Sequence, residues 1–256
     1  MKYFVFCQSD LVLEKTADGY RIPTEPPTEI KEWTTVMNVD GHRAYRIDSP
    51  LTPEPSSPLS PLTSHLYEMS PLRQSFFKLS REDYLLAGKC HELLYWDQNT
   101  KYCGVCGSPM RFDTDISKKC TQCGKEVWPQ LATAVIVRIR RGDEILLVHA
   151  RNFRGDHYGL VAGFVETGET LEEAVHREVM EETGLHITNL RYFGSQPWPY
   201  PCGLMVGFTA DYDSGKIHLQ RAELTKGAWF DRDHLPEIPD KMSIARHLID
   251  DWLNSE

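Results

Sequence analysis

Residues 163–185, GFVETGETLEEAVHREVMEETGL, hold glycines and carboxylates at separations that could do chemistry. On a helix, Glu178, Glu181 and Glu182 stand at positions i, i+3 and i+4, so their side chains share one stripe. Carboxylates stacked in this way repel one another unless a cation compensates for their charge. Hard oxygen ligands suit Mg²⁺ or Mn²⁺, which commonly bridge a protein carboxylate and a substrate phosphate. The stripe therefore predicts a divalent-metal site, with an exposed acidic helix face as the alternative.

A glycine-rich turn and one helix must position these carboxylates. Thr170 is a good N-cap and Glu173 completes a capping box, while Gly184 suits a left-handed C-terminal cap. The helical period predicts an apolar face made of Leu171, Ala174, Val175, Val179 and Met180.

Four of the seven cysteines form two CxxC pairs with 13 residues between them, each pair followed by glycine. The paired residues are Cys103 with Cys106 and Cys120 with Cys123. This spacing predicts one structural Zn²⁺ per chain, because four protein thiolates leave no position open for a substrate. Redox-active CxxC usually comes as a single pair, and disulfides are unusual in a reducing cytosol. Cys7 and Cys90 are predicted to be buried free thiols, and Cys202 has no nearby cysteine at a spacing comparable to the CxxC pairs.

The bulk composition fits a soluble globular protein. The 256 residues suffice for one large domain or two smaller ones, with 41% apolar and 25% charged residues. A net charge of −9 argues against a dedicated nucleic-acid binder. No apolar run approaches the about 20 residues of a membrane span, and the run at 3–7 is too short for a signal-peptide core. We expect a cytoplasmic protein without a membrane partner.

The landmarks divide the chain into an N-terminal α/β domain at 1–98, a zinc ribbon at 99–127 and a third domain at 128–256. Strands are predicted at 3–12 and 44–47, and the Pro- and Ser-rich stretch 49–64 reads as an irregular connection. Ser80 is expected to cap a helix whose buried side comprises Leu85, Leu86, Cys90, Leu93 and Leu94.

The third domain alternates strands and helices. A hairpin is predicted from 132–138 and 144–149, and further strands lie near 190–195, 204–212 and 228–230. An amphipathic helix at 243–253 follows. This order predicts a mixed α/β sandwich.

The segment SQPWPYP at 195–201 is the second feature that could bind a ligand. Its alternating prolines predict a stiff, extended loop. Such a loop presents planar rings at low entropic cost and suits stacking on a flat base, whereas the alternative is a cover over a core edge.

The whole pattern G-x5-E-x7-R-E-[apolar]-x-E-E-x-G-[apolar] is present and resembles the signature of the Nudix hydrolases. With the ribbon upstream and SQPWPYP downstream, the chain resembles the NADH pyrophosphatase (NudC-type) subfamily from about Arg73 onward. Tyr200 stands where Phe is usual, and Gly203 where Ser is common. The resemblance implies metal-dependent hydrolysis of NADH or NAD⁺ to nicotinamide mononucleotide and AMP, with removal of NAD caps from RNA. It also implies a mixed sheet between helices and a homodimer.

The resemblance implies residue roles as well. Glu178, Glu182, Glu223 and the carbonyl of Ala162 would hold Mg²⁺ or Mn²⁺. Glu181 would reach the metal directly or through water, and Glu181 or Glu223 would be the base. Glu169 and Arg177 would orient the turn against the helix. The residues that would contact substrate are Trp128, Gln196, Pro197, Trp198, Pro199, Tyr200, Pro201, Cys202, Gly203 and Ala245, with Arg73 and Asp115.

Two other functions stay open. A Nudix enzyme acting on ADP-ribose or another nucleoside diphosphate derivative would share every glutamate. A non-enzymatic zinc-ribbon regulator with a Nudix-shaped domain usually loses signature glutamates, which this chain keeps. Between residues 101 and 125, five Lys or Arg against two Asp make the ribbon locally positive, a weak indication of RNA binding.

Overall fold

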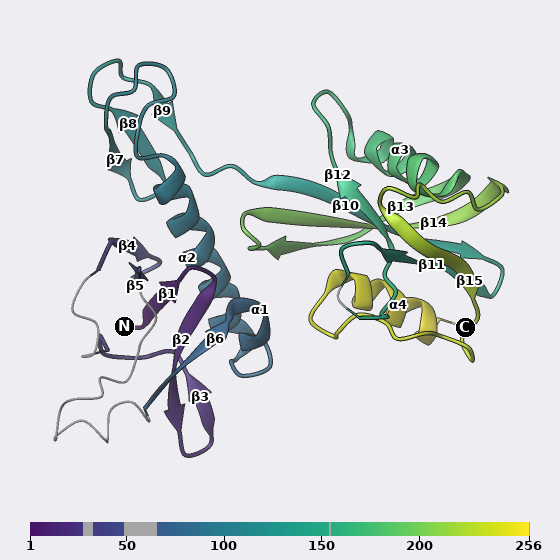
Figure 1. The fold of residues 1–256 in the computed structure, drawn as a ribbon, viewed down its shortest axis with the longest axis horizontal. Coiled ribbons are helices and arrows are strands. Elements are labelled where there is room, and N and C mark those ends of the chain that lie inside the picture. Colours follow the sequence, from purple (N-terminus) through teal and green to yellow (C-terminus); the bar gives the residue numbers. More distant parts are fainter. Residues whose placement is uncertain (28–32, 49–65, 154, 256) are drawn as a thin grey trace. The chain divides into compact units, whose positions relative to one another are not determined.

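The computed structural model describes residues 1–27, 33–48, 66–153 and 155–255 (Figure 1). The chain divides into two compact units. Unit 1 comprises Met1–Gln130 together with Pro199–Cys202, and unit 2 comprises Leu131–Trp198 and Gly203–Glu256. The predicted irregular connection at 49–64 lies outside the described residues. The finer division at 98 and 127 stays a prediction.

Unit 1 is built on a mixed sheet with the order β3-β2-β1-β5-β4, and β6 pairs with β2. Its strands are β1 Tyr3–Cys7, β2 Asp10–Thr16, β3 Gly19–Arg21, β4 Thr35–Val39, β5 His42–Ile47 and β6 Tyr67–Pro71. The predicted strand at 3–12 is therefore two antiparallel strands. They turn at Gln8, whose φ of 55° is left-handed.

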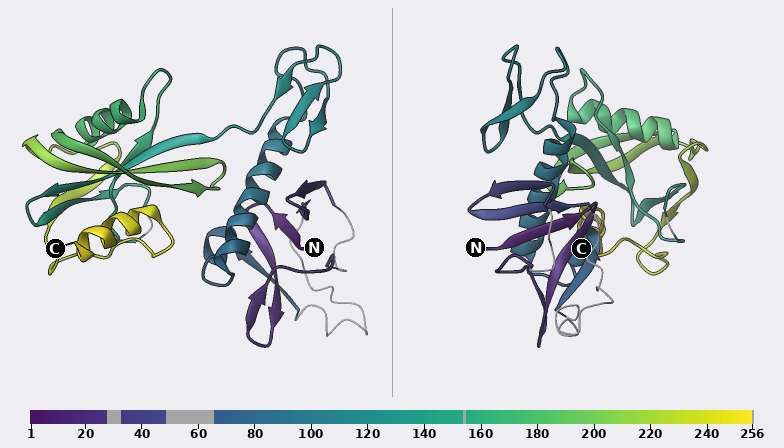
Figure 2. Two further views of the ribbon diagram at one scale, coloured as in Figure 1. Left: turned by 180° about the vertical axis from the view of Figure 1, so that it is seen from behind. Right: turned by 60° about the vertical axis from the view of Figure 1, so that its left-hand side comes forward.

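Two helices follow this sheet, α1 Leu72–Ser75 and α2 Arg81–Asn99. Ser80 caps α2 as predicted, because its side chain accepts a hydrogen bond from the backbone of Asp83. The predicted buried side is wrong at Leu85, which is 41% exposed. The buried stripe runs through Tyr84, Ala87 and Leu94, so it passes one position before Leu85. Figure 2 shows α2 running alongside the strands of unit 1.

A small antiparallel sheet follows α2, made of β7 Met110–Thr114, β8 Ser117–Cys120 and β9 Glu126–Val127. Lys118 fastens this sheet to the end of α2. Its side chain is 3% exposed, and its ammonium group lies 2.7 Å from Asp97 Oδ1 and donates to the Asp97 carbonyl at 2.9 Å. It also stands 5.3 Å from the ring centroid of Trp96 and 5.1 Å from that of Phe112. A buried charge of this kind is tolerated only when it is paired and hydrogen-bonded.

Unit 2 contains a second mixed sheet with the order β13-β14-β10-β11-β15, and β12 pairs with β10. Its strands are β10 Ala132–Arg141, β11 Glu144–Ala150, β12 Val161–Phe164, β13 Leu185–Trp198, β14 Gly203–Gly215 and β15 Leu224–Phe230. The predicted hairpin is present, with Arg141 opposite Glu144. Strands β10 and β14 are parallel, and their neighbours are antiparallel.

Helices α3 Leu171–Thr183 and α4 Ile244–Asn254 cover opposite faces of this sheet (Figure 1). Ala174, Val175 and Val179 of α3 are buried with one set of strand residues, and Leu248 and Trp252 of α4 with the other. Alternation along β10 divides the two cores, because neighbouring strand residues point to opposite faces. The predicted α/β sandwich with a mixed sheet is confirmed. Within the described ranges, no helix is long and apolar enough to cross a membrane.

Candidate active site

The glutamate helix α3 begins and ends where the sequence predicts. Thr170 Oγ1 accepts from the backbone of Glu173 at 3.2 Å, and the Glu173 carboxylate accepts from the backbone of Thr170 at 2.8 Å. At the other end, Gly184 has a φ of 68° and donates to the Met180 carbonyl at 2.9 Å. The predicted apolar face is wrong at Met180, which is 37% exposed. These caps fix the two ends of α3 and therefore the positions of its carboxylates along the chain.

The signature glutamates share one stripe but have different surroundings. Glu178 is 9% exposed and Glu182 is 4% exposed, whereas the side chain of Glu181 is 52% exposed. Glu178 and Glu182 adjoin Val175 and Val179 on the side that packs on the sheet, and Glu181 turns toward solvent. Two carboxylates of the cluster are therefore buried and one remains open to water.

Glu182 is the strongest indication of a cation site. Its Oε2 atom is buried and has no hydrogen-bond partner among the described residues. Burial, together with the charges of Glu178, Glu223 and Glu181, raises its pKa to about 8. An unpaired carboxylate in such a place is costly unless it is protonated or coordinates a metal. The donor set of oxygens suits a divalent cation.

Gly163 makes room for the second buried carboxylate. Strand β12 pairs Gly163 with Val135 of β10, which places it under α3. A Cβ atom at this position would overlap the Glu178 carboxyl group. Burial raises the pKa of Glu178, while the hydrogen bond from Arg177 opposes that shift. The adjacent carbonyl of Ala162 lies in the same strand, so the predicted backbone ligand is one residue away from this carboxylate.

Arg177 connects the glycine-rich turn to the helix. Its guanidinium donates to the two Glu169 oxygens at 2.5 and 2.9 Å, a bidentate arrangement. It also donates to Glu178 Oε1 at 2.8 Å, to Glu181 Oε2 at 3.1 Å and to the Phe164 carbonyl at 2.9 Å. The hydrogen bonds from Arg177 lower the pKa of Glu169 to about 2. The geometry is that of an orienting pair, and the orienting role itself stays a prediction.

Glu223 reaches the cluster from another part of unit 2. It is exposed, yet its charge raises the pKa of Glu178 and of Glu182. Its carbonyl accepts from the backbone of Arg151 at 2.7 Å. The end of β11 is also tied to the start of β15, which follows Glu223, because His149 Nδ1 lies 2.7 Å from Thr225 Oγ1.

Phe164 is an exposed aromatic residue that the sequence analysis did not single out, and its backbone carbonyl accepts a hydrogen bond from Arg177 of the site. Its ring is 65% exposed at the end of β12. It is two residues from Ala162, which packs against the α4 side, so its side chain points to that same face of the sheet. The sequence shows only that an aromatic residue directly follows the first glycine of the signature, and the exposure of its ring required the structure.

The predicted extended loop is only half correct. Residues 195–198 complete β13, with Gln196 opposite Met205 and Trp198 opposite Gly203, and only Pro199–Cys202 form a turn. Strand β13 is an edge strand, where a proline such as Pro197 is tolerated. A Cβ at Gly203 would lie 2.9 Å from the Trp198 carbonyl oxygen, so this pairing requires glycine.

Gln196 uses both ends of its amide inside unit 2. Its Nε2 donates to the Met242 carbonyl at 2.7 Å, and its Oε1 accepts from the backbone of Ile244 at 2.6 Å. These contacts hold the start of α4, and Ala245 follows directly and packs in the core on that side. The geometry therefore makes Gln196 a support for Ala245.

The remaining predicted substrate contacts lie in unit 1. Trp128 is 54% exposed, and Arg73 lies in α1. Asp115 is in the turn between β7 and β8, where it lines a cavity of about 300 Å³ with Phe112 and Asn38. Pro199, Tyr200, Pro201 and Cys202 belong to unit 1 as well.

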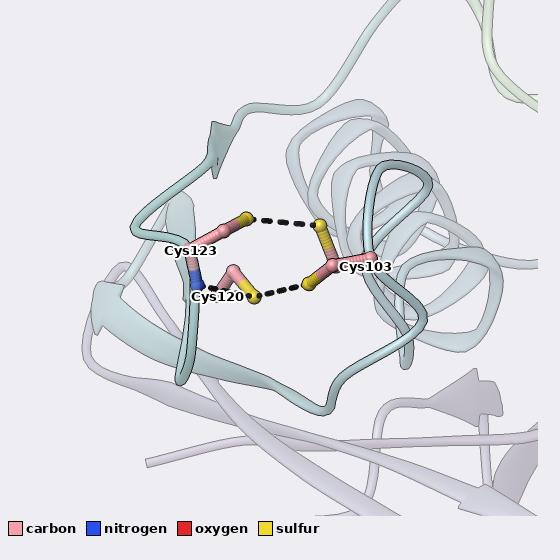
Figure 3. Close-up of side chains that lie close together, drawn as sticks. Cys103, Cys120 and Cys123 are labelled. Carbon is pink, nitrogen blue, oxygen red and sulfur yellow. Dashed lines mark hydrogen bonds between the residues drawn. The ribbon is translucent and has the colours of Figure 1, made fainter.

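The two CxxC pairs converge on one point, with their sulfurs turned toward each other (Figure 3). Within the described part of the chain they form a group whose four Sγ atoms all lie within 4.8 Å of one another. The shortest separations are 3.5 Å for Cys106 with Cys120 and 3.6 Å for Cys103 with Cys123, well beyond a disulfide bond. Hydrogen bonds from Ser108 lower the pKa of Cys106 to about 6. Four thiols in this arrangement could hold a metal ion.

Comparisons with known proteins find a family model and relatives that match this chain. The NUDIX domain model matches residues 129–252. The NAD-capped RNA hydrolase NudC of Photorhabdus laumondii is 48% identical over 66% of this chain and 66% of that protein. Its namesake in Yersinia enterocolitica is 45% identical over 72% of this chain and 70% of that protein. A crystal structure of a NUDIX hydrolase from Nitrosomonas europaea is 21% identical, with a TM-score of 0.45 over 56% of this chain and 85% of that one.

This chain belongs to the Nudix hydrolase family. The matches span about two thirds of the length of these relatives.

Proposed function

We propose that this protein hydrolyses the pyrophosphate bond of NADH or NAD⁺, giving nicotinamide mononucleotide and AMP, and that it removes NAD caps from RNA. The observation that carries the proposal is the buried carboxylate of Glu182 beside Glu178 in α3, whose Oε2 atom has no hydrogen-bond partner among the described residues. The names of the relatives, which are 45–48% identical, support the choice of substrate.

Glu178, Glu182, Glu223 and the Ala162 carbonyl would hold the divalent ion, Mg²⁺ or Mn²⁺. Such an ion neutralises phosphate charge and lowers the pKa of bound water. Gly163 leaves the space that the Glu178 carboxylate occupies, and Arg177 orients that carboxylate. The chain thus supplies a preset group of oxygens at the end of β12.

The proton of the attacking water goes to a glutamate that solvent can reach. Glu181 and Glu223 are exposed, whereas Glu178 and Glu182 are buried, so we propose one of the exposed pair as the base. A bond forms between the water oxygen and one phosphorus, and the bond from that phosphorus to the bridging oxygen breaks. The two mononucleotides then leave. The exposed ring of Phe164 offers a surface on which a flat base could stack.

We also propose that the four cysteines hold one Zn²⁺ with a structural role. The ribbon itself gives RNA binding little support. Of its basic residues, Lys118 is buried against Asp97, and Lys119 pairs with Glu126 at 3.0 Å. The homodimer and the cytoplasmic location stay predictions.

The test is incubation with NADH, ADP-ribose and NAD-capped RNA in Mg²⁺ or Mn²⁺. We expect AMP and nicotinamide mononucleotide from NADH, abolished by Glu178→Gln. The matched control is Glu172→Gln, an exposed residue in the first turn of the same helix, which should keep full activity. Equal or faster turnover of ADP-ribose would overturn the substrate assignment. No cleavage of any of the three would favour a regulatory role.

A further inference from the structure

The tip of the β13–β14 hairpin belongs to a different unit from its own strands. Pro199–Cys202 is part of unit 1, while β13 and β14 lie in unit 2. These four residues are the turn of the segment SQPWPYPC, whose rings are predicted to meet the substrate. What holds the tip therefore determines where its rings lie.

Three residues of α2 contact this tip, and they follow one stripe of the helix. Tyr84, Gly88 and His91 stand at positions i, i+4 and i+7, which share a face. The hydroxyl groups of Tyr84 and Tyr200 are 2.7 Å apart. Pro199 packs on Gly88 so closely that a Cβ at Gly88 would lie 3.0 Å from its Cγ atom.

The Tyr84 and His91 side chains on this stripe are buried. Tyr84 is 5% exposed and His91 is 8% exposed, so their polar atoms have little access to water. Burial lowers the pKa of His91, and the nearby backbone of Pro199 opposes that shift. Burial likewise raises the pKa of Tyr84, while the hydrogen bond with Tyr200 and the charge of Arg73 oppose that shift. Burial also raises the pKa of Tyr200. Both hydroxyls of the tyrosine pair therefore stay protonated near neutral pH and can hydrogen-bond.

Glycine in the middle of a helix is unfavourable by roughly 0.5–1 kcal/mol relative to alanine. At Gly88 the close approach of Pro199 explains its presence, because a methyl group would push the tip away. The stripe thus combines a hydrogen bond at Tyr84 with a glycine at position 88 that leaves room for Pro199.

We infer that the Tyr84–Gly88–His91 stripe of α2 positions the Tyr200 ring for binding of the dinucleotide, with Tyr84 as a positioning residue. The inference rests on the proposed function. It assigns the N-terminal unit a part in substrate affinity, although that unit supplies none of the glutamates proposed for hydrolysis. Tyr84 touches Tyr200 and acts through it.

The test is Tyr84→Phe in the full chain, which removes one hydroxyl and keeps the ring. We expect the KM for NADH to rise about five-fold with kcat within two-fold of the parent, as for loss of one neutral hydrogen bond. Tyr200→Phe should have the same effect, and the double variant should be no worse than either single one. Tyr102→Phe, at a ring 70% exposed in the same unit, is the control and should change neither constant.

A second readout does not depend on activity. Hydrogen exchange of the peptide that contains Tyr200 and Cys202 should accelerate in Tyr84→Phe while the thermal midpoint stays near that of the parent. If the parent cleaves NADH and Tyr84→Phe leaves both KM and exchange unchanged, the inference fails and the proposed function stands. If the parent cleaves no dinucleotide, the proposed function and the substrate role of the stripe both fail, whatever the exchange shows.

Discussion

Replacing Glu182 by Gln should stabilise the protein while it removes activity. Burial shifts the pKa of Glu182 from 4.5 to about 8 in the folded chain, so the folded state must protonate it at pH 7. Holding an acid protonated 2.5 pH units above its usual pKa costs about 3 kcal/mol, at about 1.4 kcal/mol per unit. Gln avoids that cost, but its buried amide would lack a hydrogen-bond partner, which costs about 1 kcal/mol. The net gain is about 2 kcal/mol.

The sign follows from the raised pKa of this acid. Between pH 4.5 and 8 the unfolded state binds fewer protons at this position, so the parent loses stability as pH rises through that window. The advantage of Glu182→Gln should thus be small at pH 5, grow toward pH 8 and then level off. With a slope of about 2 kcal/mol per molar urea, the midpoint should increase by about 1 M at pH 7 and by more at pH 8.

The assay is urea denaturation in buffer without Mg²⁺ or Mn²⁺, with zinc retained. Glu181→Gln is the matched control, because its side chain is 52% exposed and its neutralisation should change the midpoint little. Adding Mn²⁺ should then stabilise the parent and leave Glu182→Gln nearly unchanged. If Glu182→Gln is no more stable than Glu181→Gln at pH 8, the argument from burial is refuted.

Three further predictions concern other parts of the two units. Gly163→Ala should displace the Glu178 carboxyl and lower kcat by about 10²-fold in steady-state kinetics, whereas an unchanged kcat would contradict the close approach. Cys120→Ser should reduce the zinc content below one per chain by elemental analysis, and full retention would exclude Cys120 as a ligand. Lys118→Met should destabilise unit 1 by about 3–5 kcal/mol by leaving Asp97 uncompensated. Adding Asp97→Asn should restore much of that loss in urea denaturation.

Local chemistry explains why much of the fold follows from the sequence. Thr170 with Glu173 and Gly184 bound α3 through contacts within a few residues, so the pattern of residue types was enough to locate the helix. Ser80 located the start of α2 in the same way. The two CxxC pairs likewise predicted the sulfur cluster, because their spacing already brings the thiols of each pair together.

Burial within the elements depended on tertiary packing. The helical period places Glu178, Glu181 and Glu182 on one stripe and does not distinguish between them. Only the position of the sheet buries two of these side chains and exposes the third. Half of the predicted extended loop is a strand because residues 195–198 pair with β14. No local sequence preference specifies this pairing.

The sequence by itself determined the reaction class, the capped glutamate helix and the cysteine cluster, since each depends on residues close together in the chain. The tertiary structure alone decided which carboxylates are buried and which helix contacts Tyr200. Those facts come from contacts between Tyr84 and Tyr200, or between Gly163 and Glu178, that join distant segments. Spacing along the chain carries no information about such contacts until the sheets place the segments side by side.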